Sequence, residues 1–215
     1  MEWEKLSPRN SLLERRRTDV EKTSSQVDEL NKKIVQLQDQ LFAANKKGHE
    51  LSEDAYGVMV EKLFKEEALE IIEDALERGI KIGIVFGDVD RLKDLNDSQG
   101  HNEGDELLQL TINTLKNTLR STDIVMRKGD EFIALVMADW EGLDRVGVKI
   151  GDAVSKSYED KGFQINSFSI GVCSISDLVK DNKYLKSNPE KILEEAIKIA
   201  DERMYDNKRS KGVER

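Results

Sequence analysis

Cysteine, proline and long apolar runs are all scarce in this sequence of 215 residues. The single cysteine, Cys173, excludes an intramolecular disulfide and a zinc site built from several cysteines. No apolar run approaches the roughly 18 residues that a membrane-spanning helix needs. The first five residues, Met-Glu-Trp-Glu-Lys, lack the basic and then apolar order of a secretory signal peptide. We therefore expect a cytoplasmic protein without a membrane span in this chain.

Charged residues, in contrast, are abundant. They make up 36% of the chain, against roughly 25% in an average globular protein, which is typical of long solvated helical faces. The formal net charge of −9 argues against a protein that coats a nucleic acid polymer or an anionic membrane. Residues 1–50 carry a net charge of +1 and residues 51–215 a net charge of −10. An acidic body of this kind would need a divalent cation to bind phosphates.

Residues 1–48 contain a heptad pattern. Five apolar residues recur at intervals of seven, namely Leu13, Val20, Val27, Ile34 and Leu41. Each of the last three is followed three positions later by another apolar residue, namely Leu30, Leu37 and Ala44. β-branched residues at most a positions with leucine at d favour a parallel two-stranded coiled coil. We predict a long coiled-coil helix over residues 1–48 that forms a homodimer. The alternative is a single amphipathic helix that folds onto its own domain.

Residues 52–215 show the patterns of a domain that mixes helices and strands. Apolar periodicity and short apolar runs predict helices over 58–78, 102–119, 141–158 and 189–209, and strands over 80–86, 123–127, 132–137 and 163–175. A tight polar turn between the second and third strands indicates a β-hairpin. This order predicts an α+β fold, in which helices surround a mixed β-sheet that contains an antiparallel hairpin.

Acidic residues occur where two of the predicted strands meet their turns. Asp88 and Asp90 follow the first strand, and residues two apart at a strand end lie on the same face. Carboxylates held this close favour a bridging cation, and Mg²⁺ accepts carboxylate and phosphate oxygens together. Asp130 and Glu131 lie in the hairpin turn, so Asp130 can reach the same cation if the hairpin neighbours the first strand. The alternative for Asp88 and Asp90 is an ordinary turn rich in aspartate.

Residues 52–212 resemble the GGDEF domain, the catalytic domain of bacterial diguanylate cyclases. The matching text is Asp88-Val89-Asp90-x-x-Lys93-x-x-Asn96-Asp97-x-x-Gly100-His101-x-x-Gly104-Asp105, Arg120-x-x-Asp123, Gly129-Asp130-Glu131-Phe132, Ser169-Ile170-Gly171-Val172 and Ala200-Asp201-x-x-Met204-Tyr205-x-x-Lys208. The resemblance implies a fold like a polymerase palm. It also implies an enzyme that joins two GTP molecules into cyclic di-GMP and releases two pyrophosphates.

The resemblance implies metal-binding and catalytic roles for residues near the two acidic turns. Asp88, the Val89 carbonyl and Asp130 would bind Mg²⁺ or Mn²⁺. Asp130 would also accept the proton from the attacking hydroxyl, with Glu131 as a second metal ligand or a nearby base. Lys93 would neutralise the triphosphate. Two divalent ions that clamp the attacking and leaving oxygens are an established means of phosphoryl transfer.

The resemblance also implies a set of residues that contact the substrate, namely Arg91, Leu92, Lys93, Asn96, His101, Asp105 and Lys208. Backbone amides around Arg91 and Leu92 would bind phosphate at a helix start. Asn96 and Asp105 would recognise guanine, because a carboxylate accepts hydrogen bonds from N1–H and the 2-amino group, a pair that adenine lacks. Structural alternatives are a turn residue for Asn96 and a helix N-terminal acid for Asp105.

Arg120 and Asp123 match the motif through which cyclic di-GMP inhibits members of the family. Arginine can offer bidentate contacts to phosphate or guanine. A surface ion pair before a strand is the alternative.

The first interpretation is therefore a diguanylate cyclase that acts as a coiled-coil dimer. One departure from the family pattern supports a second interpretation. Lys128 stands where the family usually has glycine, and the turn is one residue shorter. A catalytically degenerate module that binds GTP or cyclic di-GMP and relays a signal would tolerate this change. A third interpretation is a dimerisation scaffold with a vestigial domain.

Overall fold

The computed structural model describes residue 33 and residues 53–164, 167–182 and 185–213. The chain divides into two units, Met1–Leu51 and Ser52–Arg215, and the fold described below is that of the second. The coiled coil predicted for residues 1–48 lies outside the described residues apart from Lys33, so it stays a prediction.

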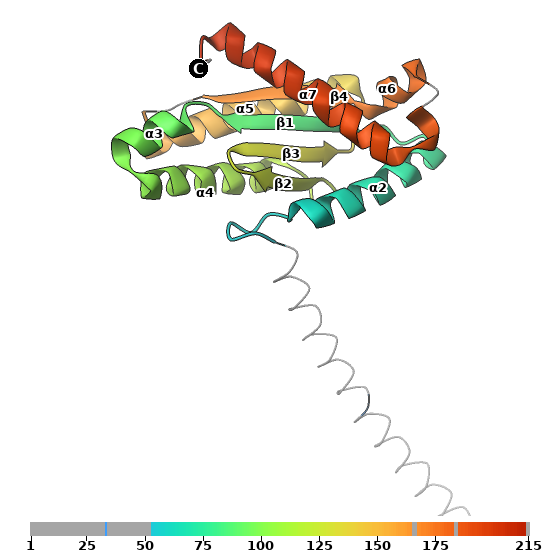
Figure 1. Cartoon of the computed structure of the whole chain (residues 1–215), viewed down its shortest axis with the longest axis horizontal. Coiled ribbons are helices and arrows are strands. Elements are labelled where there is room, and N and C mark those ends of the chain that lie inside the picture. Colours follow the sequence, from blue (N-terminus) through green and yellow to red (C-terminus); the bar gives the residue numbers. More distant parts are fainter. Residues whose placement is uncertain (1–32, 34–52, 165–166, 183–184, 214–215) are drawn as a thin grey trace, which may run out of the picture. The chain divides into compact units, whose positions relative to one another are not determined.

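Four strands form one sheet in the order β2-β3-β1-β4 (Figure 1). In chain order they are β1 (Gly83–Val89), β2 (Ile124–Lys128), β3 (Glu131–Val136) and β4 (Phe168–Ser174). The predicted α+β class and the β2–β3 hairpin are confirmed. The sheet is not mixed, however, because each of the four strands pairs with its neighbours in the antiparallel sense. β3 and β4 do run in the same direction, but β1 lies between them and runs against both.

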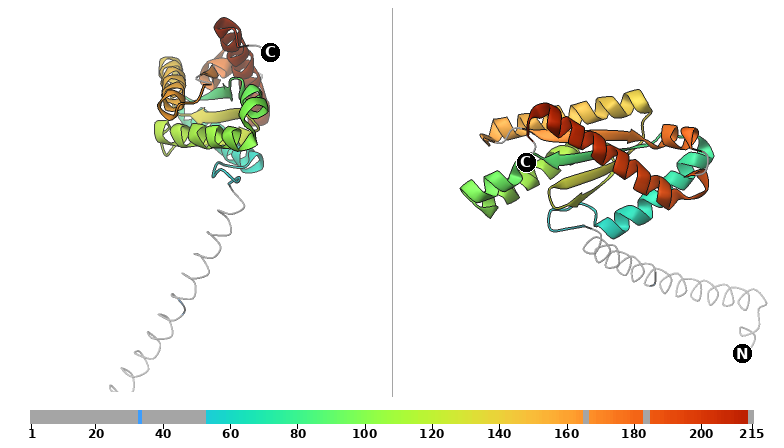
Figure 2. Two further views of the ribbon diagram at one scale, coloured as in Figure 1. Left: turned by 90° about the vertical axis from the view of Figure 1, so that its left-hand side faces the viewer. Right: turned by 45° about the horizontal axis from the view of Figure 1, so that its top comes forward.

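Helices cover both faces of this sheet (Figures 1 and 2). One face carries α2 (Glu61–Arg78), α6 (Ile175–Asp181) and α7 (Pro189–Lys211), and the other carries α3 (Leu92–Gln99), α4 (His101–Thr118) and α5 (Trp140–Lys161). A 3₁₀ turn at Leu185–Ser187 precedes α7. The four long helices were predicted from the sequence, whereas the short α6 was not. Within the described ranges, no helix combines the length and apolar character that a bilayer crossing requires.

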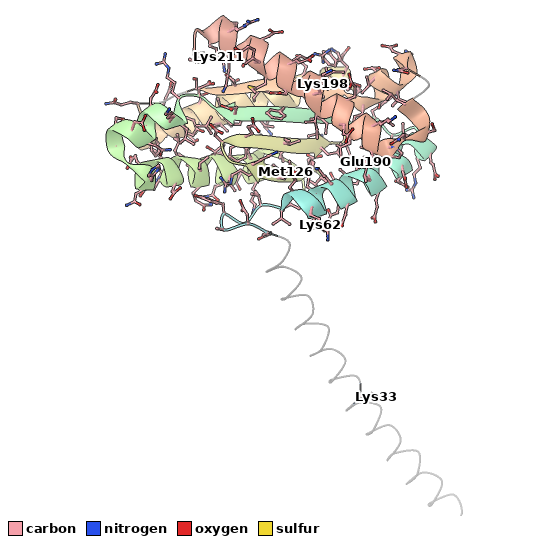
Figure 3. The ribbon with its side chains drawn as sticks, in the orientation of Figure 1. Lys33, Lys62, Met126, Glu190, Lys198 and Lys211 are labelled. Carbon is pink, nitrogen blue, oxygen red and sulfur yellow. The ribbon has the colours of Figure 1, made fainter. Side chains whose placement is uncertain are left out.

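The outer faces of the long helices are charged, as the composition indicates. Figure 3 labels Lys62 on α2 and Glu190 and Lys198 on α7, and all three side chains are exposed. Met126, in contrast, is buried in β2. Two apolar clusters, one on each face of the sheet, form the core.

β1 begins three residues later than the apolar run predicted. Gly79 adopts a left-handed conformation and ends α2, in agreement with the sequence. Ile80 is 38% exposed and lies before the strand, which starts at Gly83 and continues to Val89. The shift matters for the candidate site, because Asp88 lies within the strand, where the sheet fixes its direction. Ile84 and Phe86 contact α2 and α7, and Asp88 faces the same side because strand residues alternate.

Candidate active site

The β2–β3 turn contains two residues, Gly129 and Asp130. Lys128 and Glu131 form the last pair of the hairpin ladder, and Gly129 has a φ of 67°. Glycine with positive φ at the first of two turn positions is the pattern of a type II′ hairpin, whose twist matches that of the flanking strands. Lys128 therefore lies in regular strand geometry, where no glycine is required. The departure from the family pattern at this position does not strain the backbone.

The hairpin places its acidic residues beside Asp88. Asp88 lies directly opposite Glu131 in the β1–β3 ladder. The Val89 amide donates a hydrogen bond to the Asp130 carbonyl at 3.2 Å. Since the N–H and C=O of one strand residue point to the same side, the Val89 carbonyl also faces β3. The predicted metal ligands Asp88, Val89 and Asp130 therefore lie at one end of the sheet, together with Glu131. This is the end at which β1 leads into α3 (Figure 1, left).

Asp88 is a buried carboxylate with incomplete charge compensation. It is 6% exposed, and the Lys208 ammonium of α7 lies 2.6 Å from its Oδ1 atom. Burial nevertheless raises the pKa of Asp88 to about 6, since the effect of burial exceeds that of Lys208 and the neighbouring Asp130 and Asp90 carboxylates raise it further. The pKa of Glu131 is raised as well, by burial and then by Asp201 and Asp130. The site holds more negative charge than its lysines neutralise.

This donor set suits a hard divalent cation. In the described part of the chain, no group of three or more acidic, histidine or cysteine side chains is arranged to enclose a metal. The predicted ligands are two side chains, Asp88 and Asp130, and the Val89 carbonyl. Mg²⁺ commonly uses one or two carboxylates and takes its other ligands from substrate phosphates and water. The burial of Asp88 with incomplete charge compensation is the observation that fits a cation at this position.

Asp90 differs from Asp88 although both are buried. Its carboxylate accepts hydrogen bonds from Ser167 Oγ at 2.7 Å and from Ser169 Oγ at 2.8 and 2.9 Å. The Lys211 ammonium lies 4.0 Å from Oδ2, and the Asp90 amide donates to the Ser167 carbonyl. These bonds join the end of β1 to β4. Asp90 therefore has a structural role that its position in the motif did not indicate.

The turn from β1 into α3 supplies the predicted phosphate-binding amides. Arg91 adopts a left-handed conformation with φ 58° and ψ 26°, and α3 begins at the next residue, Leu92. A non-glycine residue in this region costs on the order of 1 kcal/mol, and such residues cluster at active sites and ligand-binding turns. No side chain caps the start of α3. The amides at this helix start are thus available to an anion.

Of the predicted substrate residues, Lys93 and Asn96 lie on α3, and His101 and Asp105 lie on α4. Lys93 is exposed on α3, and His101 is exposed as the first residue of α4. The buried Oδ1 atom of Asn96 has no hydrogen-bond partner in the described structure. It packs so closely against α4 that a Cβ atom on Gly104 would lie 1.9 Å from it. Gly104 thus permits the close packing of Asn96 against α4, and the guanine-binding role of Asn96 stays a prediction.

Residues 53–58, the lead-in segment before α2, also contact the site, and the sequence analysis missed this. The Asp54 carboxylate bonds the Arg127 Nε atom of β2 at 3.1 Å. The Tyr56 hydroxyl donates a hydrogen bond to Asp105 Oδ1 at 2.7 Å. Asp54 also accepts the amides of Tyr56 and Val58. An aspartate that accepts an amide two residues on is a recognisable turn signal, but its distant partners are not visible in the sequence.

Asp123 stabilises a turn rather than forming an ion pair with Arg120. Its carboxylate accepts the Arg120 amide at 2.9 Å and the Met137 amide at 3.2 Å. The Arg120 side chain is exposed at the start of this turn. Asp123 thus joins the segment before β2 to the end of β3. A product-binding role for the pair remains a prediction.

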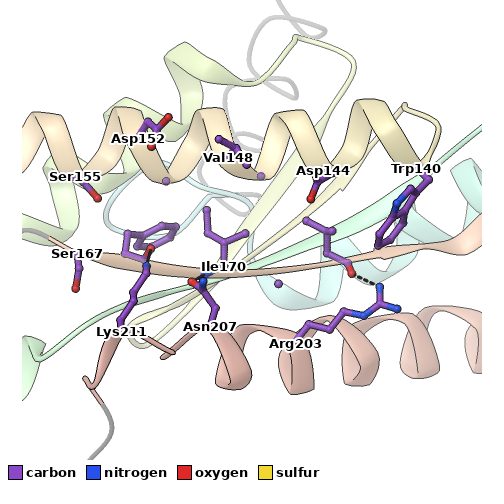
Figure 4. A pocket seen from close by; sticks show the side chains of 15 residues that line it. Trp140, Asp144, Val148, Asp152, Ser155, Ser167, Ile170, Arg203, Asn207 and Lys211 are labelled. Carbon is purple, nitrogen blue, oxygen red and sulfur yellow. Dashed lines mark hydrogen bonds between the residues drawn. The ribbon is translucent and has the colours of Figure 1, made fainter. Parts of the chain in front are cut away.

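A pocket of about 770 Å³ lies between α5 and α7 and over β4 (Figure 4), and its lining residues do not include Asp88, Asp130 or Glu131. Trp140 and Arg203 line one end of it and Lys211 the other. Three α7 side chains form hydrogen bonds with outward-facing backbone atoms of β4. Arg203 and Lys211 donate to the Val172 and Phe168 carbonyls, and Asn207 accepts from the Ile170 amide. These bonds satisfy part of an edge strand that would otherwise be open to pairing.

The GGDEF family model, described as the diguanylate cyclase GGDEF domain, matches residues 57–213. The chain belongs to this family. It is 24% identical over 163 residues to the probable diguanylate cyclase DgcJ of Escherichia coli (strain K12), an alignment that covers 75% of this chain and 30% of DgcJ. It is 30% identical over 153 residues to the diguanylate cyclase DosC of the same strain, which covers 68% of this chain and 30% of DosC. The chain thus spans about a third of the length of these relatives.

Solved structures of GGDEF proteins share the fold. The diguanylate cyclase SiaD of Pseudomonas aeruginosa, in complex with its activator SiaC, matches with a TM-score of 0.66 at 23% identity, over 94% of this chain and 74% of SiaD. The coiled coil and GGDEF domain of DgcB from Caulobacter crescentus, in complex with c-di-GMP, match with a TM-score of 0.63 at 17% identity, over 87% of this chain and 95% of that one. At these identities the likeness shows the fold alone.

Proposed function

We propose that this chain is a diguanylate cyclase that condenses two GTP molecules into cyclic di-GMP and two pyrophosphates. The observation that carries the proposal is the buried, incompletely compensated Asp88 opposite the Asp130–Glu131 hairpin. Membership of the GGDEF family and the names of the relatives support the same activity.

The residues of the site divide the work of the reaction. Lys208 and Lys93 would offset the charge of the triphosphate, and the amides that follow Arg91 would bind a phosphate at the start of α3. Asp130 would accept the proton of the ribose 3′-hydroxyl, with Glu131 as a second metal ligand or a nearby base. Mg²⁺ or Mn²⁺ held by Asp88, Asp130 and the Val89 carbonyl would supply charge stabilisation for the attacking and leaving oxygens.

Base selection would lie on α3 and α4. Asp105 would accept hydrogen bonds from guanine N1–H and the 2-amino group, and Asn96 would contact the same base. A site built for these donors leaves its own carboxylate unpaired when adenine binds, so it rejects ATP. His101 would contribute a substrate contact, and Arg120 and Asp123 would bind cyclic di-GMP as an inhibitor.

A homodimer completes the proposal. Each domain would bind one GTP, and two such halves must face each other to form a product with two-fold symmetry. A parallel coiled coil over residues 1–48 would hold the two domains at a high effective concentration. We place the reaction in the cytoplasm, where GTP is available.

One observation favours a second candidate, a domain that binds nucleotide without turning it over. Lys128 replaces a glycine of the family pattern, and Asp130 lies within the shortened two-residue turn. If the shortened turn displaced Asp130, the domain would still bind nucleotide through α3 and α4 but would lose catalysis.

Turnover of GTP separates the candidates. The full chain is incubated with GTP and MgCl₂ or MnCl₂, and the nucleotides are separated by chromatography. We expect cyclic di-GMP and pyrophosphate, and no product from the Asp88→Ala variant. GTP binding without product would select the second candidate. If the chain neither binds GTP nor forms product, a dimerisation scaffold is the interpretation that is left.

A further inference from the structure

The lead-in segment contacts the residue that we propose to recognise guanine. Tyr56 and Asp105 are 49 positions apart in the sequence, yet the tyrosine hydroxyl donates to Asp105 Oδ1 at 2.7 Å. Asp105 is an exposed side chain near the start of α4. Among the described residues, the Tyr56 hydroxyl is the hydrogen-bond donor that the structure records for the Asp105 carboxylate. The orientation of the Asp105 carboxylate therefore depends on Tyr56.

Tyr56 is itself held in place. The Arg127 guanidinium lies 4.2 Å from the centre of the Tyr56 ring, a distance typical of a cation–π contact. Arg127 is fixed in turn by its ion pair with Asp54 at 3.1 Å, in which both side chains are largely buried. The Tyr56 amide donates to the other Asp54 oxygen at 2.9 Å. The ring is thus fixed by its backbone and by one of its faces.

The same arginine reaches the hairpin turn. Arg127 Nη1 donates a hydrogen bond to the Gly129 carbonyl at 2.6 Å, next to Asp130. Arg127 therefore links the position of Tyr56 to the turn that carries the proposed metal ligand. A change in the lead-in segment would act on both the guanine-binding and the metal-binding parts of the site.

The chemistry of a carboxylate allows Tyr56 and guanine to bind together. An ionised carboxylate has two oxygens and about four acceptor positions. Tyr56 uses one of these on Oδ1, which leaves acceptor positions on both oxygens for guanine N1–H and the 2-amino group. The hydrogen bond to Asp105, together with burial, raises the pKa of the Tyr56 hydroxyl, so it stays a donor. Without the Tyr56 hydrogen bond, the Asp105 side chain would lose rotational freedom when guanine binds, at a cost in binding free energy.

We propose that Tyr56 is a positioning residue for guanine recognition, which holds the Asp105 carboxylate in the orientation that accepts both guanine donors. The inference rests on the guanine-binding role of Asp105 in the proposed function, but it does not require turnover. It assigns to the segment immediately before the catalytic domain a direct effect on nucleotide selection.

Binding of unreactive nucleotides tests this inference. The full chain and its variants are titrated calorimetrically, in Mg²⁺, with the α,β-methylene analogues of GTP and ITP, of which the second lacks the 2-amino group. Tyr56→Phe keeps the ring and removes the hydroxyl. We expect this variant to bind the GTP analogue about 5- to 10-fold more weakly and to lose most of its preference over the ITP analogue. Tyr205→Phe, the same change at an exposed tyrosine, should leave affinity and preference within about two-fold of the parent.

A double-mutant cycle distinguishes positioning from a general effect on the fold. In an Asp105→Ala background, Tyr56→Phe should have no further effect on affinity, because the group that it positions is absent. The melting temperature of Tyr56→Phe should match that of Tyr205→Phe. Unchanged preference in Tyr56→Phe, or an equal loss in the Asp105→Ala background, would overturn the inference alone. A parent chain that binds both analogues equally, and is indifferent to Asp105→Ala, would overturn the proposed guanine recognition as well.

Discussion

The two sides of the β1 end carry buried carboxylates with different surroundings. Toward β4, Asp90 is 1% exposed and accepts three hydrogen bonds from two serine hydroxyls. Toward β3, Asp88 is 6% exposed, has one lysine partner and faces two further acids, Asp130 and Glu131. Burial alone therefore does not mark a functional carboxylate. The two carboxylates differ in their interaction partners. The hydrogen bonds of Asp90 are satisfied within the fold, whereas Asp88 leaves a negative charge for a cation and its ligand to balance.

Of the changes to these two carboxylates, removal of the Asp88 charge should have the largest effect, and it should appear in activity. Asp88→Asn keeps the side-chain volume but removes an anionic ligand, so we expect cyclic di-GMP formation to fall by at least about 100-fold. The variant should also lose the rise in melting temperature that MgCl₂ and GTP give the parent. It should fold at least as well as the parent at pH 8, because burial disfavours the ionised form that Asp88 adopts above its pKa of about 6. Full activity in Asp88→Asn would remove the proposed metal role.

Substitution of Asp90, on the β4 side of β1, should lower the free energy of unfolding. Asp90→Ala leaves the hydroxyl of Ser169, which is fully buried, without its acceptor. We expect the free energy of unfolding, measured by urea denaturation, to fall by about 2–3 kcal/mol. Asp94→Ala, at an exposed position on α3, is the matched control and should stay within about 0.5 kcal/mol of the parent. If Asp90→Ala unfolds at the urea concentration of the parent, then the serine contacts do not hold the sheet together.

The pH dependence of stability should sharpen the contrast. The pKa of Asp88 rises from 3.8 to about 6 on folding, so the folded state binds this proton more tightly than the unfolded state. The stabilising contribution is complete below the unfolded value and is lost as the pH rises through 6. The stability of the parent relative to Asp88→Asn should therefore fall between pH 4 and pH 7, by on the order of 1–3 kcal/mol. A difference that is constant over this range would show that Asp88 is not electrostatically strained.

Changes in the hairpin turn should have the smallest effects. Lys128→Gly restores a glycine in the ladder, where none is needed, and should lower stability by about 0.5–1 kcal/mol with turnover changed less than about threefold. Gly129→Ala places a Cβ atom at a φ of 67° and should cost about 1 kcal/mol in the same denaturation assay. An increase in turnover of more than tenfold in Lys128→Gly would instead show that the lysine obstructs the nucleotide.

Local patterns predicted much of the fold and part of the site. The end of α2 at Gly79 and the β2–β3 hairpin depend on neighbouring residues, and both were predicted. The convergence of Asp88 and Asp130 was also expected, because each follows from its motif. The structural role of Asp90 was not, since its partners Ser167 and Ser169 lie 77 and 79 positions away. The bond from Tyr56 to Asp105 was missed for the same reason.

The sequence by itself determined the long helices and the strands, the acidic turns and the family of this protein, because periodicity, turn chemistry and motif spacing are properties of neighbouring residues. Only the tertiary structure decided that β1 lies between β3 and β4, that Asp88 meets the hairpin while Asp90 meets two serines, and that the lead-in segment contacts α4. These outcomes depend on which elements pack together. Such packing brings distant residues into contact, and the free energy of those contacts appears in no local pattern.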